Sequence, residues 1–207
     1  MVIDIEDHDL PCHTHNTYDV FFFDDITFTT VTHDPDTVSD WISEIKSVHR
    51  RRLRSLIVGL DVEWRPSFTS QYQNPVATLQ LCVGHRCLIY QLIHFPHIPE
   101  SLVDFLSDED FTFVGVGIKS DLEKLDKDYG IAGDAHAVEL GKRAADEYDR
   151  KELKKAGLKG LSSFVLRREL EKPQRVTMSR WDNRWLTRIK CSMLVLMLSC
   201  LLRLAGF

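Results

Sequence analysis

Hydrophobic and polar residues alternate near the start of the chain in a pattern that predicts a β-hairpin. Between Thr17 and Thr32, apolar residues recur at every second position, and the acidic pair Asp24 and Asp25 interrupts them. A period of two is typical of half-buried strands, and the acidic pair suits the turn between them. Residues 1–16 lack this pattern and are rich in acidic side chains, so we expect a flexible segment there.

Helical spacing follows the predicted hairpin. Asp34 and Pro35 predict a helix start, because aspartate caps helices and proline suits the first helical position. By periodicity, further strands are expected at 56–61, 76–83 and 86–92, and further helices at 99–106, 120–129, 140–147 and 160–170. Strands interspersed with helices, without an internal repeat, predict a single α/β domain.

The strand predicted at 56–61 leads into two carboxylates separated by one residue, Asp61 and Glu63. In a strand, this spacing places both side chains on the same face. A strand end delivers them to the edge of a sheet, where carboxylate oxygens can hold a hard divalent cation. Taken alone, the pair fits a solvated strand end better than a metal site, so its meaning depends on the rest of the chain.

A third carboxylate follows a second apolar strand. Residues 114–118 pass through Gly115 and Gly117 into a predicted helix that carries Asp121 in its first turn. A carboxylate at this position complements the helix dipole, so Asp121 by itself fits an ordinary helix start.

In this order, the motifs resemble those of the DEDD 3'-5' exonucleases of the ribonuclease-H-like fold, and in particular the Werner-syndrome-type branch and its plant relatives. Residues 59–64 resemble the first family motif and residues 115–121 resemble the second, with connecting blocks at 138–140, 160–165 and Trp181. The resemblance covers about residues 56–187, roughly two thirds of the chain. It implies a three-layer α/β fold, a mixed central sheet flanked by helices, formed as one exonuclease-like domain by residues 17–207.

The resemblance also implies metal-dependent hydrolysis at the 3' ends of DNA or RNA. Asp61, Glu63 and Asp121 would be the catalytic and metal-binding residues, and would hold two Mg2+ or Mn2+ ions around the scissile phosphate. Some plant relatives form rings, so the resemblance leaves a homo-oligomer open.

Three other residues are candidates for nucleic-acid contacts. Trp64, Gln80 and Trp181 could touch a nucleotide base or sugar. Aromatic side chains in core strands more often pack than stack, so a structural role is the competing interpretation.

The third family motif is a Tyr or His followed on the same helix by an Asp, and it is absent here. Carried forward from Leu186 and Thr187, the spacing places Met193 at the Tyr position and Met197 at the Asp position. No Asp, Glu or His follows Asp182 in the sequence. Residues 188–207 therefore form an aberrant third-motif segment, and we expect metal binding and hydrolysis to be impaired.

Two explanations of the missing motif stay open. The segment is either a genuine divergence to a nonenzymatic core helix or the product of a lost base near Thr187. The second explanation arises because a Met codon read one base earlier permits Tyr or Asp, as required at 193 and 197. The transcript sequence across Thr187 distinguishes the two explanations.

Charge is distributed unevenly along the chain, whose net charge is -5. Residues 1–40 contain ten acidic and no Lys or Arg residues, whereas residues 142–175 contain eleven basic and six acidic residues. A basic surface near carboxylates suits a nucleic-acid 3' end, but a solvated helix with mixed charges explains the segment equally well.

The cysteine spacing and the absence of a visible secretory signal favour an intracellular protein of the cytoplasm or nucleus. The five cysteines are irregularly spaced and do not indicate a disulfide framework. The apolar run at 191–202 is shorter than the ~20 residues of a membrane span, so we expect a core helix or an aberrant terminus and no membrane partner.

Histidines form two further groups. Cys12, His13 and His15, with His8 nearby, have zinc-ligand chemistry but lack a paired second half, so we favour a structural role. His94 and His97 are expected in a loop, and we favour the same role for them.

A noncatalytic nucleic-acid-binding or assembly subunit of the same fold is the alternative function. Metal-dependent release of mononucleotides, abolished by Asp61→Ala, would distinguish the enzyme from this alternative.

Overall fold

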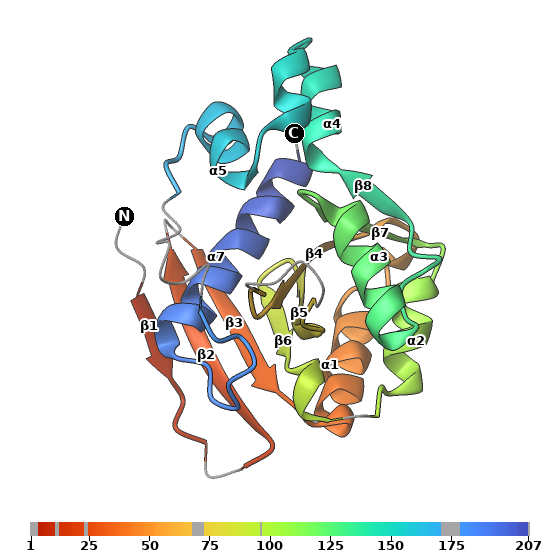
Figure 1. The fold of residues 1–207 in the computed structure, drawn as a ribbon, viewed down its shortest axis with the longest axis vertical. Helices are drawn as coiled ribbons and strands as arrows, with labels where there is room; N and C mark the ends of the chain where they lie inside the picture. Colours follow the sequence, from red (N-terminus) through yellow and green to blue (C-terminus); the bar gives the residue numbers. More distant parts are fainter. Residues whose placement is uncertain are drawn as a thin grey trace.

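A mixed eight-stranded sheet forms the centre of the molecule, with the strand order β1-β2-β3-β6-β5-β4-β7-β8 (Figure 1). The computed structural model describes residues 4–10, 13–22, 25–67, 73–95, 97–170 and 179–206. The strands are β1 (Asp4–Asp7), β2 (His15–Phe22), β3 (Asp25–Thr32), β4 (Leu56–Trp64), β5 (Val76–Val83), β6 (Arg86–Tyr90), β7 (Phe111–Gly115) and β8 (Ala137–Glu139).

Helices connect the strands and cover the sheet. They are α1 (Pro35–Val48), α2 (Glu100–Ser107), α3 (Ile118–Tyr129), α4 (Leu140–Glu147), α5 (Leu158–Leu161) and α7 (Arg188–Ala205), with short helical segments η1 (Leu53–Ser55), η2 (Leu92–His94), η3 (Lys151–Lys155) and η4 (Ser162–Leu166).

The directions of the strands decide which loops meet. β4 is antiparallel to β5, and β5 is antiparallel to β6, whereas β3 pairs in parallel with β6. β7 is parallel to both β4 and β8. Consequently β3, β4, β6, β7 and β8 all end at one edge of the sheet, which we call the carboxyl edge.

The side chains of β4 divide the core into two layers. Val58, Leu60 and Val62 belong to the buried cluster that α1, α2 and α3 complete. The opposite cluster contains α7 residues such as Leu198, together with residues of α4 and α5. Because side chains alternate along a strand, Asp61 and Glu63 point to the face that α7 covers.

Helix α7 approaches β4 closely at Gly59. A Cβ atom at this position would lie 3.3 Å from the carbonyl oxygen of Leu198 and 3.4 Å from Cγ of Leu202. Thirteen residues of α7 are buried, so the apolar run forms a core helix as predicted from the sequence.

The predicted α/β fold with a mixed sheet between helices is confirmed, as are the hairpin of β2 and β3 and the helix after Asp34. The carboxylate of Asp34 caps α1 by accepting a hydrogen bond from the backbone N–H of Thr37 at 2.9 Å. The helix predicted at 160–170 is confirmed over its first part and ends earlier than predicted, because α5 continues directly into η4, which ends at Leu166. Arg167 then adopts a left-handed backbone conformation that cannot continue a helix.

The N-terminal segment differs from the flexible region that was expected. β1 pairs antiparallel with β2, and His15 and Asn16 already belong to β2. Arg188 of α7 also forms an ion pair with Asp7 at 3.3 Å. Backbone pairing and this long-range contact stabilise the segment. Its polar sequence has no hydrophobic periodicity from which a strand could be predicted.

A disulfide joins Cys82 and Cys87, contrary to the expectation from cysteine spacing. The two residues lie directly opposite each other in the hairpin of β5 and β6. Such proximity results from strand register, which the spacing of five scattered cysteines does not reveal. Cys191 and Cys200 of α7 are buried thiols.

Within the described part of the chain, every helix is too short or too polar to span a membrane.

Substituting Gly59→Val tests the close approach of α7. The added methyl groups would meet the Leu198 carbonyl and Leu202, so we expect a loss of about 1–3 kcal/mol in the free energy of unfolding. Urea denaturation measures this loss. Gly157→Ala is the control, because a Cβ at Gly157 meets no atom within 4 Å. Equal midpoints for the two variants would show that α7 does not press against β4.

Candidate functional site

The end of β4 brings two of the predicted acidic residues to the carboxyl edge. Asp61 and Glu63 are both partly exposed, with the buried Val62 between them. In the register of the sheet, Asp61 lies opposite Gln80 and Glu63 lies opposite Thr78 of β5. Both carboxylates therefore belong to the same strand end, as the spacing predicted.

A glycine turn positions the third acidic residue. β7 ends at Gly115, where a Cβ would lie 2.9 Å from Cβ of Ile118, and Gly117 adopts φ +77°. These two positions let the chain turn sharply into α3. The turn places Asp121 in the first turn of α3, where it is 9% exposed.

The electrostatic environment of Asp121 links it to the end of β4. Burial raises the pKa of Asp121 to about 7, and the negative charges of Glu63 and Glu139 contribute to the rise. The structure therefore brings Asp121 and Glu63 within electrostatic reach of each other, although they are distant in the sequence. Like charges at close range are costly unless a proton or a cation compensates them.

Glu139, at the end of β8, is a site residue that the sequence analysis did not single out. Its Oε2 atom accepts a hydrogen bond from the backbone N–H of Gly117 at 2.8 Å. Its Oε1 atom accepts one from Gly141 at 3.4 Å, which caps α4. Glu139 thus ties the glycine turn before α3 to the start of α4. The available signal was its place in the block at 138–140, directly before the helix predicted at 140–147.

The structure tests whether these residues fit a divalent cation. Within the described ranges, no three His, Cys, Asp or Glu side chains stand close enough together to hold a metal ion. The chemistry nevertheless suits a hard cation, because the carboxylates are crowded and Oδ2 of Asp61 is buried. Oε1 of Gln80, opposite Asp61, is buried and has no hydrogen-bond partner among the described residues. An oxygen in that state is a further potential ligand.

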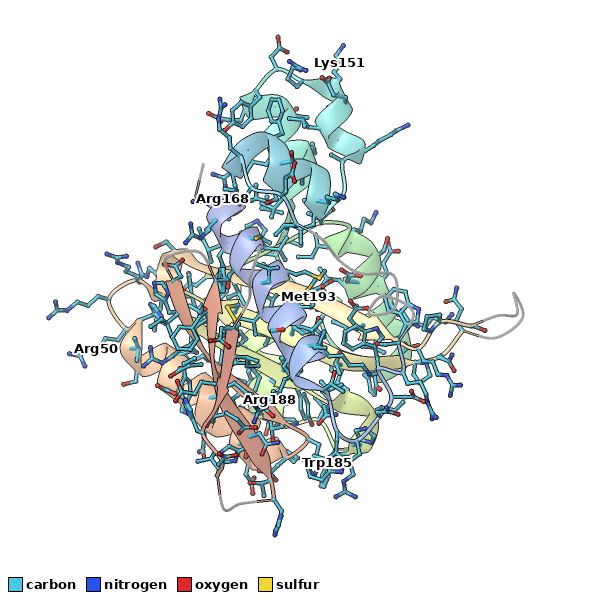
Figure 2. All side chains as sticks on the ribbon, turned by 90° about the vertical axis from the view of Figure 1, so that its left-hand side faces the viewer. Arg50, Lys151, Arg168, Trp185, Arg188 and Met193 are labelled. Carbon is cyan, nitrogen blue, oxygen red and sulfur yellow. A yellow bond between two sulfur atoms is a disulfide. The ribbon has the colours of Figure 1, made fainter. Side chains whose placement is uncertain are left out.

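The two methionines at the third-motif positions lie on α7. Met193 is 6% exposed and Met197 is half-buried next to Leu198, whose carbonyl approaches Gly59. Figure 2 shows Met193 in the middle of the helix as it crosses the sheet. Neither thioether suits a hard cation, which prefers oxygen ligands.

The predicted nucleic-acid contacts at Gln80 and Trp181 are not available on the surface. Both side chains are fully buried. Nε2 of Gln80 donates to the carbonyl and the hydroxyl of Thr78 at 3.0 and 2.6 Å. The ammonium of Lys190 lies 5.2 Å from the ring centroid of Trp181. The burial of these two side chains depends on tertiary packing, which the sequence does not show.

Trp64 is half-buried and also packs against its surroundings. Nζ of Lys124 lies 5.2 Å from the Trp64 ring and 2.9 Å from a carboxylate oxygen of Asp128. These contacts attach the end of β4 to α3, and the nucleic-acid contact of the half-buried Trp64 stays a prediction.

The sequence-predicted histidine groups also have structural contacts. His8 pairs with Asp19 at 3.2 Å and with the hydroxyl of Thr17 at 3.0 Å. Cys12 lies outside the described residues, and the remaining histidines form no metal cluster within them.

Comparisons with known proteins identify relatives of this chain. A family model described as 3'-5' exonuclease matches residues 29–192. A 3'-5' exonuclease of Arabidopsis thaliana is 36% identical over 131 residues, which cover 60% of this chain and 43% of that protein. The Mus musculus bifunctional 3'-5' exonuclease/ATP-dependent helicase WRN is 31% identical over 128 residues, which cover 61% of this chain and 9% of that protein. The chain thus spans less than half the length of these curated relatives.

Solved structures show the same fold. The EXO domain of Aedes aegypti Nibbler has a TM-score of 0.68 at 16% identity, and the match covers 85% of this chain and 84% of that one. Escherichia coli RNase D, an exoribonuclease, has a TM-score of 0.66 at 16% identity over 85% of this chain and 43% of that one. The EXD2 exonuclease domain, from a crystal soaked in Mg and GMP, has a TM-score of 0.50 at 22% identity over 84% and 85%.

The raised pKa of Asp121 predicts an unusual dependence of stability on pH. The carboxyl group binds its proton more tightly in the folded state than in the unfolded state, where its pKa is 3.8. Its contribution is fully present below about pH 4 and is lost as the pH rises through about 7. Without divalent metal, we expect Asp121→Asn to be more stable than the parent chain at about pH 8, on the order of a few kcal/mol, and similar at about pH 4.

Urea denaturation at the two pH values, with EDTA present, measures this difference. Glu123→Gln is the control, since Glu123 is exposed on the same helix. Equal effects of Asp121→Asn at both pH values would contradict the burial of an ionisable carboxyl group.

Proposed function

Because the chain belongs to the 3'-5' exonuclease family, we propose that it binds the 3' ends of DNA or RNA and is a metal-dependent 3'-5' exonuclease domain with impaired hydrolysis. The convergence of Glu63, Asp121 and Glu139 at the carboxyl edge supports this proposal most directly. Two strand ends and the first turn of α3, which are distant in the sequence, contribute these carboxylates, and a cation would relieve their mutual repulsion.

Asp61, Glu63 and Asp121 would hold Mg2+ or Mn2+. When bound, two such ions supply an activated water and stabilise the leaving oxygen. The same ions were used for the EXD2 exonuclease domain, whose crystals were soaked in Mg and GMP and in Mn and Mg. In this chain, Glu139 would act as a positioning residue, because both of its oxygens are hydrogen-bonded to the backbone at the turns before α3 and α4.

The impairment follows from α7. The resemblance assigns a water-orienting Tyr to position 193 and a metal-binding Asp to position 197, and this chain has methionine at both. Without a carboxylate from α7, the metal shell lacks one negative ligand and the nucleophile lacks its orienting hydroxyl. We therefore propose that nucleic-acid ends bind here more effectively than they are cleaved.

The same two methionines favour a second candidate function, a noncatalytic nucleic-acid-binding or assembly subunit. The two candidates share the fold and the carboxyl edge, and only metal-dependent product release separates them. A homo-oligomer is compatible with either candidate.

An intracellular site of action, in the cytoplasm or nucleus, is part of the proposal because nucleic-acid ends are found there. The disulfide between Cys82 and Cys87 is the observation that weighs against a reducing compartment.

Binding of Mn2+ tests the metal site independently of hydrolysis. We expect weak binding in titration calorimetry, because the chain offers three acidic ligands in place of four, and we expect Asp61→Ala to abolish it. Asp40→Ala is the control, since Asp40 is an exposed acid of α1. Unchanged heats for Asp61→Ala would place any bound ion elsewhere.

The double substitution Met193→Tyr and Met197→Asp tests the impairment. We expect it to restore part of the metal-dependent release of mononucleotides from labelled single strands and recessed duplexes, by roughly tenfold or more. Recovery would be incomplete because the rest of α7 still carries side chains selected for packing. The matched control is Met193→Leu with Met197→Leu, which preserves size without adding a ligand. If the parent chain already digests as fast as the Tyr–Asp variant, the third motif is dispensable.

A further inference from the structure

A hollow lined by histidines lies at the carboxyl edge, away from the acidic residues. Its lining includes three imidazoles, a guanidinium, an indole and an amide, which come from His13, His15, His33, Arg184, Trp185 and Gln91. We call this feature the histidine hollow. The proposed hydrolysis does not use any of these side chains.

The sheet topology places the histidine hollow on the same edge as the candidate metal site. His33 directly follows β3 and Gln91 directly follows β6, whereas Asp61 and Glu63 lie at the end of β4. The strand order β3-β6-β5-β4 separates the hollow from the end of β4 by three strand spacings, about 14 Å. A few nucleotides of a single strand can bridge such a distance.

The segment that carries Arg184 and Trp185 is fixed in position. Nε2 of the buried Gln91 donates to the carbonyl oxygens of Asn183 and Arg184 at 3.1 and 3.0 Å. Trp185 is 65% exposed, the largest exposed fraction among the large hydrophobic side chains of the described residues. Figure 2 shows it near the start of α7, where Arg188 is also labelled. A large indole held in solvent by a rigid loop is a ready stacking surface.

The guanidinium of Arg184 lies within electrostatic reach of His33. Burial lowers the pKa of His33, and the nearby charges of Arg184 and His94 lower it further. Asp34 opposes this effect, but one of its oxygens already accepts hydrogen bonds from the backbone and hydroxyl of Thr37 at 2.9 and 2.7 Å. An anion beside Arg184 and His33 would pair with the guanidinium and would raise the pKa of the imidazole again.

We propose that the histidine hollow binds an internal nucleotide of a single strand whose 3' end lies at the acidic residues, with the phosphate beside Arg184 and His33 and the base stacked on Trp185. This inference rests on the proposed function for the direction of the strand. The basis of recognition is the combination of a fixed exposed aromatic surface and adjacent cations, which suits a phosphate and a base together.

Binding of 5'-labelled oligothymidylates of increasing length, measured by fluorescence anisotropy with the full chain in Mn2+ before any digestion is detected, tests the proposal independently of hydrolysis. We expect Trp185→Ala to weaken binding of the longer strands roughly tenfold and Trp185→Phe to weaken it much less. A dinucleotide is too short to reach the histidine hollow, so its affinity should not change. Arg184→Ala should reduce the slope of log affinity against log salt by about 0.7.

Two matched controls lie at the opposite edge of the sheet. Ile26→Ala removes another exposed hydrophobic side chain, at the start of β3, and Arg50→Ala removes an exposed arginine after α1. Neither should alter binding. Quenching of tryptophan fluorescence, measured in a Trp64→Phe background, is a second readout for Trp185, because Trp41 and Trp181 are 4% and 0% exposed. Urea midpoints equal to that of the parent chain would show that the variants fold.

The outcomes separate this inference from the proposed function. In one outcome, Trp185→Ala loses binding, and neither the parent chain nor its Tyr–Asp variant digests the strand. This outcome supports the histidine hollow and overturns the proposed nuclease activity. Digestion by the Tyr–Asp variant with the same affinity and KM after Trp185→Ala and Arg184→Ala overturns the histidine hollow and supports the nuclease. Binding of Ni2+ or Zn2+ by the histidines, with oligonucleotide affinity unchanged in both variants, also overturns it and identifies the feature as a metal site.

Discussion

The close approach of α7 to β4 is the contact on which the rest of this structure depends. Gly59 lets the helix backbone reach the strand, since a side chain there would meet the carbonyl of Leu198. That approach closes one of the two core layers and buries most of α7. Asp61 and Glu63 follow Gly59 on the same face of the same strand, so the contact that stabilises the fold also determines which helix residues lie beside the candidate site.

The acidic cluster has an electrostatic cost that the fold accepts. Negative charge comes to the carboxyl edge from Asp61 and Glu63 in β4, Asp121 in α3 and Glu139 in β8. Burial and the charges of Glu63 and Glu139 raise the pKa of Asp121 to about 7. Glu139 partly compensates by accepting hydrogen bonds from the backbone at the start of two helices. A cluster maintained at this cost is typical of a site that binds a cation.

Binding and cleavage can be separated in such a protein. The features that would hold a strand, the carboxyl edge and the histidine hollow, come from β3, β4, β6 and the segment before α7. The features that would complete the chemistry come from α7, where methionines occupy two positions. Under the proposed function, a change confined to one helix would remove catalytic groups and would leave the surface for nucleic acid in place, provided that α7 still packs against Gly59.

The sequence by itself predicted most of the strands and helices and named most of the candidate residues. Alternation predicted β2 and β3, a capped start predicted α1, and the spacing of Asp61 and Glu63 placed both on one face, because these properties depend on residues close together in the chain. Sequence also identified Asp121, since a glycine turn between strand and helix is local. The helix expected at 160–170 ends earlier, at Leu166, because the left-handed conformation of Arg167 is not encoded by periodicity.

Only the tertiary structure decided how distant residues meet. The role of Glu139, the burial of Gln80 and Trp181, the disulfide between Cys82 and Cys87 and the ordering of β1 all depend on strand register or on packing by α7. The histidine hollow likewise joins residues from β2, β3, β6 and the 184–185 segment. Such contacts form between parts of the chain that carry no local signal of each other, because the free energy that selects them comes from burying the whole core at once.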